Sequence, residues 1–371
     1  MNCNLHLILR KIAEEKLFIA AVLLVILLLT TAAPSPEEMK EGESALTVRI
    51  EFRKIIEREN LPPVLSALFR IEIIIFLTLV VSGIVLNVRG IADRNWKFFP
   101  AVKSPETRWG IWPVIKLSLY FFSTILLWQR FESGLCSVLG LVRMNVYYRL
   151  VLVNAFLQFL ILTIFVIGFL SRYRYAGRLS AEAVLPLWSP GSTIIDRFRN
   201  QRSTLPELLG ISREGWSGKL RQAVRGYILF FPILLILIIV SLVGIDILGL
   251  PYQPHPLVQP LLEAGDNSLL WALFVVGILL GPLAEELFFR GVLFPALKKR
   301  LNVSWSVIIS ALLFSSLHQT WAGFLPIFGL GILLAHSYQK TGSLLVPIFI
   351  HIIHNGLFLT FTVLVFQLTG S

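Results

Sequence analysis

Residues 269–280, LLWALFVVGILL, carry no charge, and residues 281–291, GPLAEELFFRG, follow them with two glutamates and an arginine. A helix needs about 20 predominantly apolar residues to cross a bilayer. An ionisable side chain at mid-membrane costs several kcal/mol, roughly 3 on insertion scales, and such residues usually face the bundle interior and serve a function. The stretch therefore predicts a membrane helix that carries a polar site.

The rest of the chain repeats this apolar pattern. Its 371 residues are 56% hydrophobic and 15% charged, whereas an ordinary soluble domain has about 25% charged residues. No series of alternating segments of about 10 residues suggests an outer-membrane barrel. We therefore predict an all-α, polytopic transmembrane bundle of about nine helices. The apolar segments are roughly 17–33, 71–88, 111–128, 150–170, 228–249, 268–290, 303–320, 323–338 and 343–367.

The net charge of +11 is explained by membrane orientation. Residues 171–227 hold ten Lys or Arg against four acids, whereas residues 250–267 hold two acids and no Lys or Arg. Basic loops stay in the cytoplasm, so the N-terminus is expected in the cytoplasm and the C-terminus outside. We expect an integral protein of a bacterial plasma (inner) membrane, with the lipid bilayer as a partner and no nucleic acid. Segment 17–33 is either a retained anchor, which we favour, or a cleaved signal peptide.

The chain divides at about residue 226. Residues 1–226 are predicted to form an N-terminal membrane region with four transmembrane helices and the basic cytoplasmic loop. Residues 227–371 hold the ionisable groups expected at mid-membrane and are predicted to form the functional core. The two cysteines, Cys3 and Cys136, offer no disulfide framework and no CxxC metal site.

Spacing groups the polar residues of the core. Glu286 and Arg290 are four residues apart with the acid first, a good order for a helical ion pair. Glu285 points about 100° away and is left for another role. His351 and Asn355 are also four apart and share a helix face. At ~1.5 Å rise per residue, Glu285 lies about 20 Å before Lys298, well inside a bilayer.

These side chains suit hydrolysis of an acyl bond. A carboxylate and an imidazole in a desolvated pocket can activate water, and an amide and an imidazole can donate hydrogen bonds to an oxyanion. The alternative is a zinc site, with Glu285, His318 and His351 as ligands and an open position for water. The sequence contains no HExxH or GxSxG motif.

Three motifs in order carry a family resemblance: EExxxR from Glu285 to Arg290, FxxxH ending at His318, and HxxxN from His351 to Asn355. Together they resemble the CPBP family, the CAAX prenyl endopeptidases and bacteriocin-processing, Abi-type membrane proteins. The resemblance covers roughly residues 205–368.

By that resemblance, Glu285 and His318 activate the attacking water, and His351 and Asn355 stabilise the oxyanion. Glu286 and Arg290 support the site. The family has been described with both glutamate and metal mechanisms. We favour the glutamate mechanism, without a cofactor, because the zinc candidates would come from three separate helices with no local two-ligand spacing.

The predicted function is therefore an intramembrane endopeptidase that acts on a protein or peptide substrate, membrane-embedded or membrane-associated. Two alternatives remain: a catalytically silent membrane scaffold of the same fold, and a proton-coupled transporter that uses the buried Glu and His. A transporter often shows inverted repeats, and we find none. His336 and His354 are interpreted as structural. Gly323, Gly329 and Gly331 are expected to permit close helix packing.

Overall fold

The computed structural model describes residues 63–93, 97–99, 109–138, 156–175, 215–250, 267–318 and 320–369. Within these ranges the regular structure is helical and contains no strand, which confirms the all-α prediction. Eight of the nine predicted apolar segments are helices, and segment 17–33 lies outside the described residues. The elements are α3 (Pro63–Ala92), α4 (Ile111–Val138), α6 (Phe156–Tyr175), α9 (Trp216–Leu248), α11 (Asn267–Phe274), η3 (Val275–Leu280), α12 (Gly281–Phe288), η4 (Phe289–Leu293), α13 (Phe294–Lys298), α14 (Val303–Ser316), α15 (Trp321–Thr341) and α16 (Leu345–Thr369).

Among the described residues, five helical stretches are long and apolar enough to cross a membrane. One of them is the continuous run from α11 to α13, in which the apolar residues 269–280 continue through the two glutamates to Lys298. The five stretches are Pro63–Ala92, Trp216–Leu248, Leu269–Lys298, Trp321–Thr341 and Leu345–Val365.

Local sequence explains where several helices begin and end. The side chain of Asn302 accepts a hydrogen bond from Trp305 N at the start of α14, and Thr320 does the same for Gly323 N at the start of α15. Such caps satisfy backbone N–H groups that have no partner in the first turn. Helices α9 and α15 end at Gly249 and Gly342, both with positive φ (61° and 62°), a conformation that glycine adopts without steric cost.

The described helices fall into two compact units. One unit contains α4 and α6, which pack together and bring the ring of Trp109 to 5.6 Å from that of Phe169. The other contains α3, α9 and all helices from α11 to α16. Helix α3 thus shares a unit with the C-terminal helices, and the functional division at residue 226 stays a prediction.

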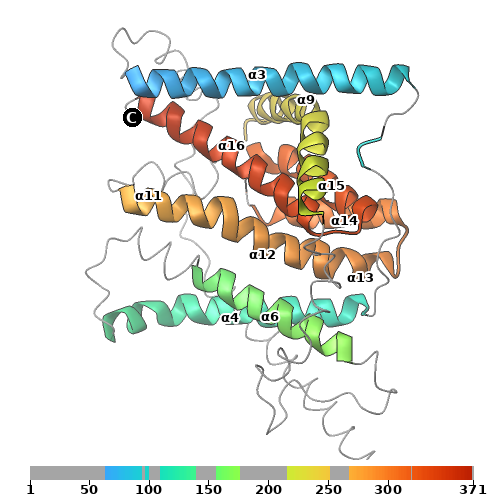
Figure 1. Ribbon diagram of the computed structural model, residues 1–371. Helices are drawn as coiled ribbons and strands as arrows, with labels where there is room; N and C mark the ends of the chain where they lie inside the picture. The colour runs from blue at the N-terminus through green and yellow to red at the C-terminus, as the bar shows by residue number, and fades with distance from the viewer. Residues whose placement is uncertain are drawn as a thin grey trace, which may run out of the picture. The chain divides into compact units, whose positions relative to one another are not determined.

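Helix α9 lies at the centre of the larger unit and packs against α15, α3 and α16. Figure 1 shows the C-terminal end of α16 beside the start of α3, where the rings of Phe69 and Phe361 stack at 6.1 Å. Small residues permit the close contacts. A Cβ at Gly331 would lie 3.0 Å from Cα of Ala311 on α14, and one at Gly329 would collide with Leu237 on α9. The predicted packing role of Gly329 and Gly331 is confirmed, whereas a Cβ at Gly323 would meet Thr320 and Ile327 at the start of its own helix.

The crossing of α3 and α9 gives a first prediction. A Cβ at Gly83 would collide with the carbonyl oxygen of Ile228 and lie 2.7 Å from the Pro232 ring. Gly83→Ala is therefore expected to lower the free energy of unfolding by about 1–3 kcal/mol, because overpacking forces the helices apart. Thermal unfolding in detergent measures the loss. Gly244→Ala in α9 is the matched control, since nothing lies within 4 Å of its added Cβ. An equal effect of both substitutions would contradict the close crossing.

Candidate active site

The two glutamates lie on a short α-helical stretch between two π-helical ones. Helix α12 carries Glu285 and Glu286, η3 precedes it and η4 follows it with Arg290. π-Helical turns inside α-helices are rare and frequent at functional sites. Each π turn shifts the register of the following residues, so the glutamates take an orientation that a regular helix would not give them.

Glu286 and Arg290 form the ion pair that their spacing predicts. Arg290 Nη1 lies 2.8 Å from Glu286 Oε1, and both side chains are fully buried. Arg290 also donates from Nη2 to the carbonyl oxygen of Gly331 at 3.1 Å. Its guanidinium carbon lies 4.6 Å from the centroid of the Phe314 ring, a cation–π distance. One arginine therefore ties the α11–α13 run to α14 and α15.

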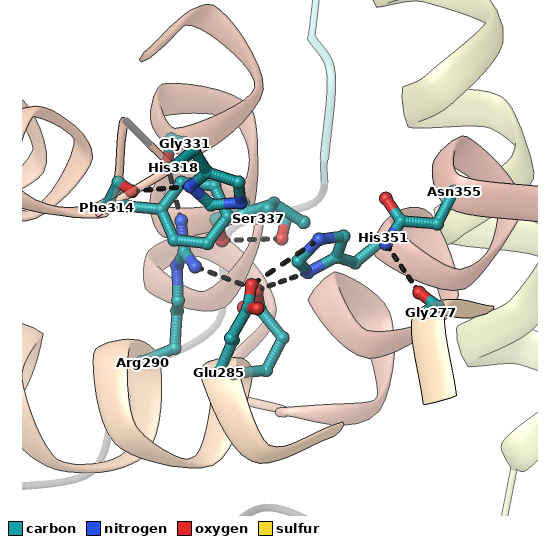
Figure 2. Close-up of polar contacts among 11 residues, drawn as sticks. Gly277, Glu285, Arg290, Phe314, His318, Gly331, Ser337, His351 and Asn355 are labelled. Carbon is teal, nitrogen blue, oxygen red and sulfur yellow. Dashed lines mark hydrogen bonds and ion pairs between the residues drawn. The ribbon is translucent and has the colours of Figure 1, made fainter. Parts of the chain in front are cut away.

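His351 of α16 lies between the two glutamates. Its Nδ1 is 3.0 Å from Glu286 Oε1, and its Nε2 is 3.8 Å from Glu285 Oε2. The imidazole is buried, whereas the Glu285 side chain is 35% exposed. Figure 2 shows the ring of His351 directed toward Glu285 of α12. Glu285 is thus the carboxylate with access to an incoming molecule, and Glu286 is enclosed between Arg290 and His351.

Asn355 lies one turn after His351 on α16 and contacts the same α11–α13 run. Its Nδ2 donates to the carbonyl oxygen of Gly277 in η3 at 2.7 Å (Figure 2). The predicted shared face of His351 and Asn355 thus meets the helix that carries the glutamates, at two successive points.

His318 connects to the site through Phe314. Its Nδ1 lies 2.8 Å from the carbonyl oxygen of Phe314, one turn earlier in α14. Nδ1–H is the donor in this bond, so the neutral ring has its lone pair on Nε2. The Phe314 ring lies 4.8 Å from the ring of His318 and 5.6 Å from that of His351. The four-residue spacing of FxxxH already indicates the first contact.

Two backbone groups in the site were not predicted from the sequence. The carbonyl oxygens of Gly277 and Gly331 accept hydrogen bonds from Asn355 and Arg290. Side-chain motifs do not reveal backbone acceptors, although close packing was predicted at Gly331. The histidines interpreted as structural make other contacts. His354 Nδ1 lies 3.2 Å from the hydroxyl of Tyr227, and the His336 ring lies 6.1 Å from that of Phe99.

A zinc site at these residues would need at least three ligands grouped around one point. In the part of the chain that the structure describes, no three His, Cys, Asp or Glu side chains are grouped so that they could hold one metal ion. Structural and catalytic zinc sites use at least three protein ligands. This arrangement does not fit a zinc ion at Glu285, His318 and His351.

Residues 267–357 match the Rce1-like family of type II CAAX prenyl endopeptidases. That range contains Glu285, Glu286, Arg290, His318, His351 and Asn355. This match supports the similarity of residues 267–357 to the CPBP family.

Two curated relatives support the family. MroQ of Staphylococcus aureus (strain USA300), a membrane-embedded CAAX protease by name, is 32% identical over 142 residues, 36% of this chain and 56% of MroQ. YdiL of Bacillus subtilis (strain 168), named as a candidate membrane peptidase, is 31% identical over 83 residues, 22% of this chain and 34% of YdiL. The match thus spans about half of one relative and a third of the other. No solved structure matches the chain.

The CPBP region and the five long apolar helices make this chain an integral membrane protein. The resemblance based on the three motifs is confirmed.

Proposed function

We propose that this protein is an intramembrane endopeptidase of the CPBP type that hydrolyses a peptide bond with water activated by Glu285 and His318. The observation that carries the proposal is the row of Glu285, His351 and Glu286, in which one imidazole has a carboxylate at each nitrogen. The family and the names of the relatives support a protease.

Glu285 serves as the general base. Its carboxylate takes a proton from water as the water oxygen attacks the carbonyl carbon of the substrate, with His318 as the second group that orients the water. The tetrahedral intermediate then collapses, the C–N bond breaks, and the proton on Glu285 passes to the leaving amine. The partial exposure of Glu285, beside buried neighbours, suits a group that must meet both water and substrate.

His351 and Asn355 stabilise the oxyanion of the intermediate. Nδ1–H of His351 donates to Glu286, so Nε2 carries a proton only when the ring is doubly protonated. In that form Nε2–H gives a charge-assisted hydrogen bond to an oxyanion. Glu286 fixes the ring and balances its charge, and Arg290 holds Glu286. The last two are positioning residues.

The substrate is a protein or peptide that is embedded in the membrane or bound to it. For the orientation we propose a plasma-membrane protein with a cytoplasmic N-terminus and an external C-terminus. The basic ends of two described helices support this orientation, with Lys298 at the end of α13 and Lys340 at the end of α15. The lipid bilayer is the other proposed partner, and we propose no role for nucleic acid.

The test follows cleavage of a peptide library by the detergent-purified protein in water enriched in oxygen-18. Half of the library consists of apolar peptides in mixed micelles. We expect one oxygen-18 atom in each new carboxyl group and full activity in the presence of 1,10-phenanthroline. Loss of cleavage with the chelator, restored by zinc, would contradict the glutamate mechanism. A folded protein that cuts no peptide in either half would support the catalytically silent scaffold instead.

A further inference from the structure

The acceptor of the Asn355 hydrogen bond exists because of a break in the helix beside the site. In η3 the N–H of Gly281 donates to the carbonyl oxygen of Val276, five residues earlier. The next residue in this register, Pro282, would serve the carbonyl of Gly277, but proline has no N–H. Gly277 therefore has a carbonyl oxygen without its helical donor.

Asn355 supplies the missing donor. Its Nδ2 lies 2.7 Å from the Gly277 oxygen, and this bond settles which end of the amide faces η3, because a carbonyl oxygen needs a donor. One of the two amide protons is used in the bond. The second Nδ2 proton can be donated to another acceptor. The bond to Gly277 limits rotation of the amide group and so sets the direction of this proton.

A side chain of a neighbouring helix also supplies the donor that a proline lacks at a second place in the larger unit, away from the glutamates. Pro326 inside α15 has no N–H for the carbonyl of Ala322, four residues earlier. Ser241 of α9 donates to that oxygen at 2.8 Å. Neighbouring helices commonly satisfy the carbonyls that prolines leave without a donor in membrane helices. At Pro282 the donor is a residue of the candidate site, which makes the proline part of the catalytic geometry.

We propose that Pro282 is a positioning residue for Asn355: by withholding an N–H it keeps the Gly277 carbonyl available, and that carbonyl aims the second amide proton at the oxyanion. The role of Asn355 in this inference rests on the proposed function. The hydrogen bond and its dependence on Pro282 do not, and they are tested by a separate measurement.

The separate measurement uses nuclear magnetic resonance of protein labelled with nitrogen-15 in asparagine. The side-chain signal of Asn355 is identified by its loss in Asn355→Ala. Pro282→Ala restores an N–H that competes for Gly277, so the Asn355 signal is expected to shift. Pro326→Ala is the matched control and leaves the signal in place. An unchanged Asn355 signal in folded Pro282→Ala overturns the proposal.

A second variant separates the missing N–H from the proline ring. Lactic acid at position 282 is the ester analogue of alanine, with neither a ring nor an N–H. The Asn355 signal is expected to keep its wild-type position in this variant. A shift of the Asn355 signal in the ester variant as large as in Pro282→Ala overturns the proposal. If Pro282→Ala does not fold, any such shift in the ester variant is by itself enough to overturn it.

The activity arm uses a double-mutant cycle. Pro282→Ala is expected to lower kcat between about 10-fold and 100-fold with little change in KM, the scale of a small misplacement in a catalytic group. In the Asn355→Ala background it should have almost no further effect, whereas Pro326→Ala should combine with Asn355→Ala within about twofold of additivity. Additive losses from Pro282→Ala and Asn355→Ala overturn the link to catalysis. A wild type without activity overturns the proposed function, and the resonance measurement still decides the hydrogen bond.

Discussion

Glu285→Gln is expected to lower kcat by about 10²–10⁴-fold, the usual contribution of a general base. Glutamine keeps the size of the side chain but cannot accept the proton of the attacking water. The side chain is 35% exposed, so the change removes no fully buried charge and the melting temperature should stay close to that of the wild type. Single-turnover cleavage of the best peptide from the library measures the effect, with thermal unfolding on the same sample.

His354→Asn provides the matched control for this experiment. His354 follows His351 by three residues on α16, but its Nδ1 is directed at the hydroxyl of Tyr227. We expect kcat to stay near the wild-type value in this variant. Wild-type cleavage by Glu285→Gln would show that the site is assigned wrongly, and equal losses in both variants would point to general disruption of α16 and its neighbours.

The sequence predicted the helices because their apolar segments are long and uninterrupted. It predicted the Glu286–Arg290 pair for a local reason, since a four-residue spacing brings two side chains together in almost any helix. The shared face of His351 and Asn355 followed in the same way. These features depend on a single helix, and helical geometry alone determines them.

The features that join helices were beyond such reasoning. Both π-helical stretches change the register around Glu285, and no spacing rule for a regular helix allows for them. The placement of Phe314 between Arg290, His318 and His351 depends on how α14 meets its neighbours. Helix α3 is apolar on all sides, and such a sequence does not indicate which face packs against other helices. Its place beside α9 and α16 therefore came only from the structure.

Arg290→Met should be the most damaging of these substitutions for stability, with a loss of about 3–5 kcal/mol in the free energy of unfolding. Methionine fills much of the space of arginine but leaves the Glu286 carboxylate without its cation in a fully buried position. Glu286 Oε2 already has no hydrogen-bond partner among the described residues, so the carboxylate depends on the contacts at Oε1. Thermal and denaturant unfolding in detergent measure the loss.

The double variant Glu286→Gln/Arg290→Met distinguishes two causes of the lost stability. One is the unpaired carboxylate of Glu286, and the other is the loss of the contacts that the Arg290 guanidinium makes. If the cost of Arg290→Met comes from the unpaired carboxylate, removing that charge should restore a large part of the stability. His351 keeps an oxygen acceptor at residue 286 in the double variant, but that acceptor is neutral, so a doubly protonated ring is no longer stabilised and kcat should stay low. A double variant no more stable than Arg290→Met would instead assign the cost to the lost contacts of the guanidinium with Gly331 and Phe314. Recovery of both stability and full activity would show that the charge of Glu286 has no part in holding His351 for catalysis.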